Sequence, residues 1–349
     1  MFNQTLSFNS LSREINMRGT GIFSVVLCLV IFPRFPSGNS EPRLAPALYV
    51  LGDSLFDSGN NNFLPTLARA DFQPYGVNFP GGATGRFTNG RTVADFIVVT
   101  LFFLSFLVSL LVGAFFGGLK IAEFLGLPMS PPFMSFQNSR TLTGLNYASG
   151  SCGILPETGN YIKIRVRFGV FSGWALLYDL GFLDLQVFWA LSLKRLYKLG
   201  ARKVVVFEIG PVGCIPSIIR QYEHNGQCVE EINRFVSLFN AQLGKILKNL
   251  TSNLPGSAFV LGHVHWLGYD AIMHPSRYGL GDVGDPCCTT WANGTSGCIP
   301  ELQPCTPTDN HYFWDAFHLT EAVYSVIAAR CINDTSVCMP TTIKALVQI

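Results

Sequence analysis

Two short stretches near opposite ends of the chain carry residues that can do chemistry together. Gly52-Asp53-Ser54-Leu55 offers a serine hydroxyl, and Asp315-Ala316-Phe317-His318 offers an imidazole and a carboxylate. A serine hydroxyl is a poor nucleophile near neutral pH, so it needs a positioned base to remove its proton. Asp315 lies three residues before His318, a spacing that lets the carboxylate reach the imidazole and fix its tautomer. The residue types therefore predict Ser54 as nucleophile, His318 as base and Asp315 as the group that orients the base.

The elements around these stretches are of the kind that would position them. Leu48-Tyr49-Val50-Leu51 reads as a buried strand and is followed by the polar turn 57–62, so Ser54 is expected where a strand breaks and backbone N–H groups are unpaired. Residues 202–210 and 258–261 predict further strands, and 191–199 and 229–250 predict helices, the first of which stops at Gly200. Residues 310–329 place Asp315 and His318 in a loop that enters the last helix.

Taken singly, each motif also has a purely structural interpretation. Gly-Asp-Ser is a common turn tripeptide, and an aspartate three residues before a histidine is often a surface pair. The longer strings around them favour the catalytic interpretation. These strings are 49–62, Gly85-Arg-Phe-Thr-Asn-Gly-Arg91, Asn146-Tyr-Ala-Ser-Gly150, Gly210-Pro-Val-Gly-Cys214 and Phe313-Trp-Asp-Ala-Phe-His-Leu-Thr320, in this order.

This series resembles the plant GDSL-motif esterase/lipase family of the SGNH hydrolase superfamily, over residues 45–96, 122–160 and 190–335. The resemblance implies catalytic roles for Ser54, Asp315 and His318, and an oxyanion hole formed by the N–H groups of Ser54 and Gly150, with Gly153 as the alternative to Gly150. It also implies a flavodoxin-like three-layer α/β/α fold with a parallel sheet and the site at the carboxyl ends of its strands. The implied reaction is hydrolysis of a carboxylic ester of a small molecule or a lipid through an acyl-serine. No metal or organic cofactor is expected.

One family block is absent from the sequence. A Gly-x-Asn-Asp block, whose asparagine donates to the oxyanion, should lie between the Asn146 string and the strand that ends at Gly210, but none occurs. The segment 161–190 does not resemble the family and is too short for the expected helices and strand. A core strand and one oxyanion donor are therefore predicted to be missing, which makes the fold incomplete. Loss of one such donor typically lowers the rate by about 10² to 10³.

An apolar insertion at 97–121 is the second departure from the family. Relatives run almost directly from Phe96 into Ala122 within one helix, whereas here the stretch 96–119 contains no charged residue. Three interpretations compete: a membrane span, a buried hairpin, or intron sequence translated from an aberrant gene model. The composition, the position inside a helix and the missing segment downstream favour the last. If the stretch 96–119 contacted a membrane, the membrane would be a binding partner of the protein.

The termini and composition predict a secreted, extracellular chain. Arg13 and Arg18 precede an apolar run at 22–32, which fits a secretory signal cleaved near Ser40, with an uncleaved anchor as the alternative. The prediction is a leader at 1–40 and a single hydrolase domain at 41–340, interrupted at 97–121. The 349 residues carry a net charge of +2 with scattered basic residues, which gives no signature of nucleic-acid binding.

Cysteine usage supports secretion. Ten cysteines occur, one of them (Cys28) in the leader, and six cluster after residue 286, which suggests loops joined by disulfides with one thiol left over. A zinc site formed by Cys287, Cys288, Cys298 and Cys305 is disfavoured because no paired Cys-x-x-Cys is present. Three glycosylation sequons begin at Asn249, Asn293 and Asn333.

Two further expectations concern the surroundings of the site. Several aromatic residues are candidates for an acyl pocket, although they would equally suit an ordinary core: Phe56, Phe63, Phe72, Tyr75, Phe87 and Trp314. The resemblance also suggests that Arg86 and Asn89 shape the entrance. Because of the missing block and the insertion, two alternatives to an active hydrolase stay open. One is a catalytically impaired relative that acts as a binding or membrane-associated protein, and the other is a chain that is never made as written.

Overall fold

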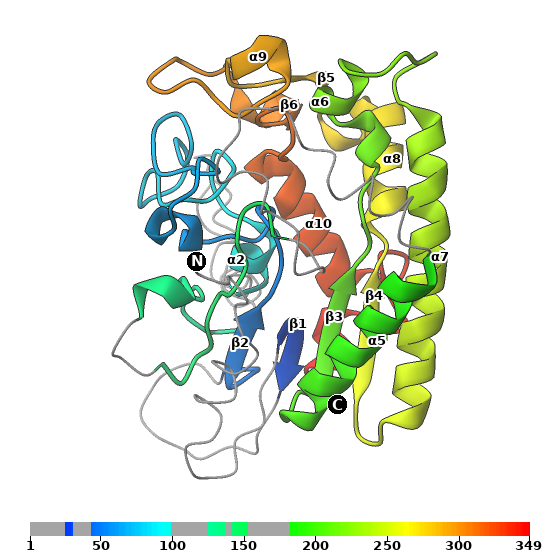
Figure 1. The fold of residues 1–349 in the computed structure, drawn as a ribbon. Helices are drawn as coiled ribbons and strands as arrows, with labels where there is room; N and C mark the ends of the chain where they lie inside the picture. The colour runs from blue at the N-terminus through cyan, green and yellow to red at the C-terminus, as the bar shows by residue number, and fades with distance from the viewer. Residues whose placement is uncertain (1–24, 31–42, 99–124, 137–140, 153–181) are drawn as a thin grey trace, which may run out of the picture.

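The computed structural model describes residues 25–30, 43–98, 125–136, 141–152 and 182–349 (Figure 1). The insertion 97–121 falls outside these residues except for its first two, as do Gly153 and the segment 161–181. Among the described helices, none combines the length and the apolar character that crossing a membrane requires.

A five-stranded sheet forms the centre of the molecule, in the order β2-β1-β3-β4-β7. Its strands are β1 (Val25–Val30), β2 (Ala47–Val50), β3 (Lys203–Phe207), β4 (Ala258–Gly262) and β7 (Cys338–Met339). β3 pairs in parallel with both β1 and β4, whereas β2 and β7 pair antiparallel with their neighbours. A second sheet joins β5 (Asp282–Pro286) to β6 (His311–Phe313) in parallel.

Helices cover both faces of the large sheet. α5 (Phe182–Lys198) and α7 (Glu230–Asn253) lie on one face, and α2 (Val93–Val98) and α10 (Glu321–Asn333) lie on the other (Figure 1). The remaining helical segments are η1 (Asn60–Phe63), η2 (Phe133–Ser135), η4 (Val212–Cys214), α6 (Pro216–Ile219), α8 (Val264–Met273), η5 (Pro275–Tyr278), α9 (Trp291–Gly294), η6 (Thr308–Asn310) and α11 (Ile343–Leu346).

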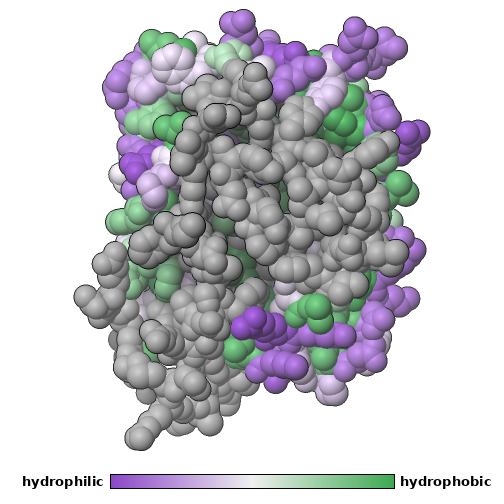
Figure 2. Space-filling model, in the orientation of Figure 1, coloured by the Kyte–Doolittle hydropathy of each residue, from purple (hydrophilic) through white to green (hydrophobic). Residues whose placement is uncertain are grey.

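Alternation along β3 and β4 creates the two cores of this three-layer arrangement. Successive strand residues point to opposite faces, so Val204 and Val206 pack with α5 and α7 while Val205 packs on the side of α2 and α10. α7 presents an apolar stripe to the sheet at helical spacing and turns its polar residues outward, where Figure 2 shows hydrophilic residues along that side of the molecule. The α/β fold class is confirmed, and the two antiparallel edge strands qualify the predicted parallel sheet.

The predicted strands and helices around the site are present. Residues 48–51, 202–210 and 258–261 correspond to β2, β3 and β4, and 191–199 and 229–250 fall within α5 and α7. The helix α5 is followed by Gly200, which has a φ of 107°, a left-handed conformation that glycine adopts without strain. β2 ends four residues before Ser54, and the ring of Phe207 at the end of β3 stacks on that of Phe56, with centroids 5.8 Å apart.

The strand β1 is a finding that the sequence did not predict. Val25–Val30 lies inside the run interpreted as a secretory signal, yet in the structure it stands between β2 and β3. A segment that is cleaved off and one that forms a central strand are mutually exclusive, because cleavage near Ser40 would remove β1 from the sheet. The division into leader and single domain remains a prediction.

Four disulfides join eight cysteines, as the cysteine clustering predicted. The pairs are Cys214–Cys228, Cys287–Cys305, Cys288–Cys298 and Cys331–Cys338. Cys152 is exposed and belongs to none of these four pairs. Cys287–Cys305 and Cys288–Cys298 both lie in the loop 287–305. This loop lies next to the strand β6, which leads into Asp315.

Candidate active site

Ser54 lies in a tight turn four residues beyond the end of β2. Asp53 forms this turn, since its side-chain Oδ1 accepts the N–H of Leu55 at 2.9 Å and its carbonyl accepts the N–H of Phe56 at 3.2 Å. Gly52 opens the turn, and a Cβ there would lie 3.0 Å from the ring of Phe56. Ser54 is half-buried, and its N–H has no hydrogen-bond acceptor among the described residues. The turn thus presents both the hydroxyl and a backbone donor.

Asp315 and His318 occupy a second turn, between β6 and α10. The Oδ1 of Asp315 accepts the N–H groups of Phe317 and His318, each at 2.8 Å, and the N–H of Trp314 donates to the carbonyl of His318 at 2.7 Å. The carboxylate of Asp315 is fully buried. His318 Nδ1 lies 2.8 Å from both of its oxygens. The turn therefore holds carboxylate and imidazole in one fixed relation.

The fold brings the two turns together. His318 Nε2 lies 2.7 Å from Ser54 Oγ, although the two residues are 264 positions apart in the sequence. This is hydrogen-bond distance, the separation that proton transfer from a serine to a base needs. With Nδ1 on Asp315 and Nε2 on Ser54, the imidazole has the orientation in which Nε2 accepts a proton.

Two carboxyl groups set the electrostatics around the imidazole. Burial alone would raise the pKa of Asp315, but attraction to His318 and hydrogen bonds from His318, Tyr75 and Phe317 outweigh it and lower that pKa. Asp315 therefore stays ionised and faces His318 as a negative charge. Burial raises the pKa of Asp53, and the N–H of Leu55 and the nearby His318 oppose that rise.

The predicted oxyanion donor Gly150 has a partner within the protein. Its N–H donates to Asp57 Oδ2 at 3.0 Å, across 93 residues of sequence. Asp57 is fully buried and its Oδ1 accepts the N–H groups of Gly59 and Asn60, each at 2.7 Å. A hydrogen directed at a buried carboxylate is not offered to a substrate, so the predicted role of Gly150 requires this bond to break. Gly153 lies outside the described residues.

Three side chains fasten the loop of Gly150 to the loop that follows Ser54. Asn60 Nδ2 donates to the carbonyls of Asn146 and Ala148, and Asn61 Nδ2 donates to that of Gly150. Ser149 Oγ in turn donates to Asn61 Oδ1 at 2.6 Å. The sequence indicated only a polar turn at 57–62, because partners some 90 residues away leave no local signal.

The surroundings differ from the expectations for a pocket and an entrance. Arg86 is buried and paired with Asp95, and Asn89 is fully buried, so neither lines an entrance. Tyr75, Phe87 and Trp314 are buried with the disulfide loop, Phe87 also packs 5.0 Å from the imidazole of His318, and Phe63 is half exposed at 51%. The hydroxyl of Tyr75 nevertheless reaches Asp315 at 2.6 Å, a contact that sequence reasoning missed.

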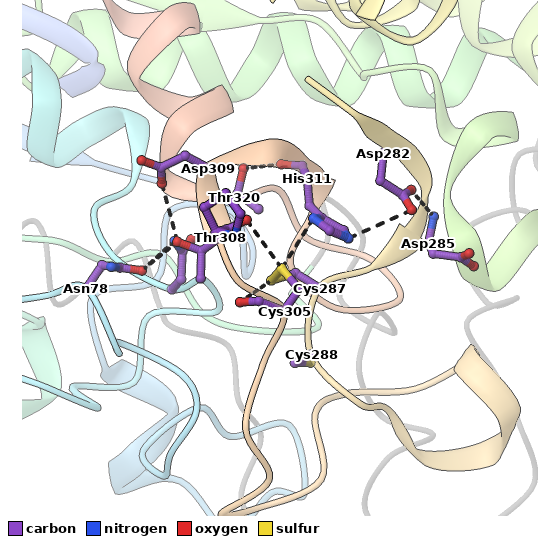
Figure 3. Close-up of a disulfide and its surroundings, with 12 residues drawn as sticks. Asn78, Asp282, Asp285, Cys287, Cys288, Cys305, Thr308, Asp309, His311 and Thr320 are labelled. Atoms are coloured by element: carbon purple, nitrogen blue, oxygen red, sulfur yellow. Dashed lines mark hydrogen bonds and ion pairs between the residues drawn. A yellow bond between two sulfur atoms is a disulfide. The ribbon is translucent and has the colours of Figure 1, made fainter. Parts of the chain in front are cut away.

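The cysteine-rich loop does not provide the zinc site considered from the sequence. Cys287 with Cys305 and Cys288 with Cys298 form disulfides, so their sulfurs are not thiolate ligands. His311 Nδ1 lies 3.2 Å from the sulfur of Cys305, and its Nε2 lies 3.8 Å from Asp282 Oδ2 (Figure 3). Among the described residues, the ligand atoms of Cys287, Cys305 and His311 lie within 4.8 Å of one another, but both sulfurs belong to one disulfide.

Comparison with known proteins identifies the family of the chain. Residues 184–331 match the family model described as GDSL-like Lipase/Acylhydrolase. The chain is 36% identical to GDSL esterase/lipase 7 of Arabidopsis thaliana, over 87% of this chain and 93% of the relative. It is 34% identical to GDSL esterase/lipase At1g71691 of the same plant, over 88% of this chain and 87% of the relative. On this similarity, which spans nearly the whole of both proteins, the chain belongs to the plant GDSL esterase/lipase family of carboxylic ester hydrolases.

Proposed function

We propose that the protein is a secreted serine ester hydrolase that cleaves small-molecule or lipid esters through an acyl-serine intermediate. The single observation that carries the proposal is the continuous hydrogen-bonded line from Asp315 through His318 to Ser54 Oγ. The names of the relatives, which are esterase/lipases, support the class of reaction.

The mechanism follows from the positions of the three side chains. Ser54 Oγ attacks the ester carbonyl while its proton passes to His318 Nε2, and the charge of Asp315 stabilises the imidazolium. Collapse of the tetrahedral intermediate breaks the bond to the alcohol, which leaves with the proton from His318. Water then attacks the acyl-serine with His318 again as base, which releases the carboxylic acid and restores the serine.

The oxyanion of each tetrahedral intermediate needs donors. The N–H of Ser54 is the donor that the turn leaves available, and we propose it as one member of the oxyanion hole. Gly150 would join it only if the intermediate draws its N–H away from Asp57. Burial raises the pKa of Asp57, and the N–H groups of Gly59, Gly150 and Asn60 oppose that rise.

Replacement of the serine tests the proposal. Ser54→Ala should lower kcat on a short p-nitrophenyl ester by at least about 10³-fold, because nucleophile and proton donor are lost together. A fluorophosphonate should label wild type at Ser54, as read by mass spectrometry of the peptides. Ser58→Ala is the matched control, since Ser58 is a buried serine of the same loop whose Oγ has no hydrogen-bond partner among the described residues. Equal rates for wild type and Ser54→Ala, or labelling at another serine, would end the proposal.

A further inference from the structure

Tyr75 is a buried tyrosine whose hydroxyl meets the carboxylate of the candidate triad. Its side chain is 1% exposed, and its hydroxyl lies 2.6 Å from Asp315 Oδ2. The two residues are 240 positions apart in the sequence, so the contact is made by the fold. None of the roles assigned above to Ser54, Asp315 and His318 accounts for it.

The hydrogen of this hydroxyl has a fixed direction. The N–H of Cys298 donates to the phenolic oxygen at 3.2 Å, so the oxygen acts as acceptor on that side and its own hydrogen goes to Asp315. Burial, and then the negative charge of Asp315, raise the pKa of Tyr75 well above its ordinary value. The phenol is therefore a neutral donor over the whole range in which an esterase works.

The two oxygens of Asp315 are held by different groups. Oδ1 accepts the N–H groups of Phe317 and His318, whereas Oδ2 accepts the hydroxyl of Tyr75. His318 Nδ1 lies at 2.8 Å from both. Without the tyrosine, the imidazole would be the one partner of Oδ2 among the described residues, and the carboxylate would be held less firmly on that side.

Tyr75 is itself fastened to the walls of the site. Its ring packs edge-on against Phe72 and Phe87, with centroids 5.2 and 6.1 Å away, and Phe87 lies 5.0 Å from the imidazole of His318. Cys298, which donates to its hydroxyl, is joined by a disulfide to Cys288. The N–H of Cys288 donates to the carbonyl of Trp314, the residue before Asp315, at 2.9 Å. Both sides of the Tyr75–Asp315 contact thus belong to one rigid unit.

We propose that Tyr75 is a positioning residue of the hydrolase, which holds Oδ2 of Asp315 and moderates the charge that Asp315 presents to His318. The inference rests on the proposed function, because it concerns the carboxylate that orients the base. Tyr75 itself does not touch the reacting atoms.

Removal of the hydroxyl of Tyr75 should shift the pH dependence of the reaction in one direction. In Tyr75→Phe the carboxylate of Asp315 accepts one hydrogen bond fewer, so its negative charge attracts the protonated imidazole more strongly. The imidazole then stops acting as a base at a higher pH. The other ionisable groups that face the pair, Asp53 beside His318 and Tyr324 beside Asp53 and Asp315, are unchanged in the variant. We expect the acidic limb of the kcat/KM profile to move up by roughly half a pH unit. We also expect kcat to fall roughly tenfold, with KM changed by less than about twofold.

The experiment compares wild type, Tyr75→Phe and Tyr312→Phe. Tyr312 is a second buried tyrosine, three residues before Asp315, so its variant loses a phenol without touching the carboxylate. The pH profile is measured on a short p-nitrophenyl ester. The titration of the imidazole itself is followed by NMR of protein labelled at histidine Cε1, with the His318 signal identified among the six histidines by its absence in His318→Asn.

The outcomes separate the inference from the function on which it rests. An upward shift of both midpoints in Tyr75→Phe, with Tyr312→Phe at the wild-type values, supports the inference. Unchanged midpoints in a folded Tyr75→Phe overturn it, even if kcat falls, because a merely structural role lowers the amount of active enzyme without moving a titration. If wild type hydrolyses no ester, the proposed function fails, and the NMR midpoint of His318 alone then decides for or against the role of Tyr75.

Discussion

The ion pair between Arg86 and Asp95 shows how single residues fix the framework of the site. The guanidinium binds the carboxylate through Nε and a second nitrogen at 2.7 and 2.8 Å, and both side chains are almost completely buried. Asp95 also accepts the N–H of Thr92 at 2.9 Å, which satisfies a free donor at the start of α2. The pair thus joins the loop before α2 to the helix itself.

Asp95→Asn should strongly destabilise the protein. The substitution keeps the size of the side chain but leaves the charge of Arg86 buried without its partner, which typically costs about 3–5 kcal/mol. Urea unfolding at neutral pH measures this change in the free energy of unfolding. The matched control is Asp71→Asn, which removes a half-exposed pair with Arg69 and should cost less than about 1 kcal/mol. Equal effects of the two substitutions would contradict the role assigned to the buried pair.

The same pair predicts a pH dependence with a definite sign. Burial would raise the pKa of Asp95, but Arg86 and the hydrogen bonds from Arg86 and Thr92 outweigh it and leave that pKa below its ordinary value of 3.8. A carboxyl with a lowered pKa stabilises the folded state above its unfolded-state pKa and loses that contribution as the pH falls through the folded value. The difference in stability between wild type and Asp95→Asn should therefore be constant near neutrality and shrink below about pH 4.

At the scale of residues, the sequence predicts the candidate catalytic side chains better than it predicts the residues that contact them. Ser54, Asp315 and His318 could be found because their types and local spacing carry a signal, and the structure places them within hydrogen-bond distance. The partners of Gly150 and Asp315 in Asp57 and Tyr75 could not, since they are distant in the chain. The resemblance alone suggested that Arg86 shapes the entrance, and it could not show that Arg86 is buried against the carboxylate of Asp95.

At the scale of elements, the residues on either side of the undescribed segment 99–124 lie next to each other. α2 ends at Val98, and the N–H of Leu125 donates to the carbonyl of Val98 at 3.3 Å. Both residues are buried in the core. If residues 99–121 were absent, Leu125 would be the fourth residue after Val98, and this contact would be an ordinary i to i+4 bond of an α-helix. The contact fits the hypothesis that one helix was interrupted.

Deletion of residues 99–121 should therefore leave the fold intact. A shorter connection closes at a smaller entropic cost, by about 0.6 kcal/mol for each halving of its length, so the melting temperature should stay equal or rise. Thermal unfolding monitored by circular dichroism checks this, together with ester hydrolysis by both forms.

A second deletion controls for the register of the helix. Removal of 99–123 leaves Leu125 only two positions after Val98, where no helical hydrogen bond to that carbonyl can form, and we expect it to destabilise the protein. A lower melting temperature for the deletion of 99–121 than for the full chain would speak against an interrupted helix. Membrane fractionation of both forms adds a test of the competing interpretation, because a membrane span would be lost with the deletion.

The elements themselves were predicted where pattern and length agree. β3, β4 and α7 carry the expected periodicities, and each has its predicted type and nearly its predicted bounds. Pattern alone was insufficient at β1, because a short apolar run in a signal peptide and one in a buried strand have the same composition. Whether the run 25–30 forms a strand depends on its pairing with β2 and β3, which lie far from it in the sequence or are not adjacent to it in the chain.

At the scale of the whole molecule, the central sheet and the predicted secretion make opposite demands on the amino terminus. Val25–Val30 pairs with both β2 and β3, so it fills the space between them. The family resemblance predicts that a core strand is missing from the chain between the Asn146 string and β3, and β1 lies next to β3 in the sheet. Removal of the leader would expose the paired edges of β2 and β3.

Expression in plant cells with N-terminal sequencing distinguishes the two fates of this segment. If the chain is exported as proposed, the protein in the medium should begin near Glu41, because the leader is removed on translocation. Its mass should fall on treatment with an N-glycosidase, since Asn249, Asn293 and Asn333 are all exposed and accessible to glycosylation. Thr251→Ala, Thr295→Ala and Thr335→Ala together remove the sequons without changing the asparagines and should abolish the fall in mass. A secreted, glycosylated protein that still contains Val25–Val30 would contradict cleavage near Ser40 and would leave β1 available to the sheet, without affecting the proposed chemistry of Ser54.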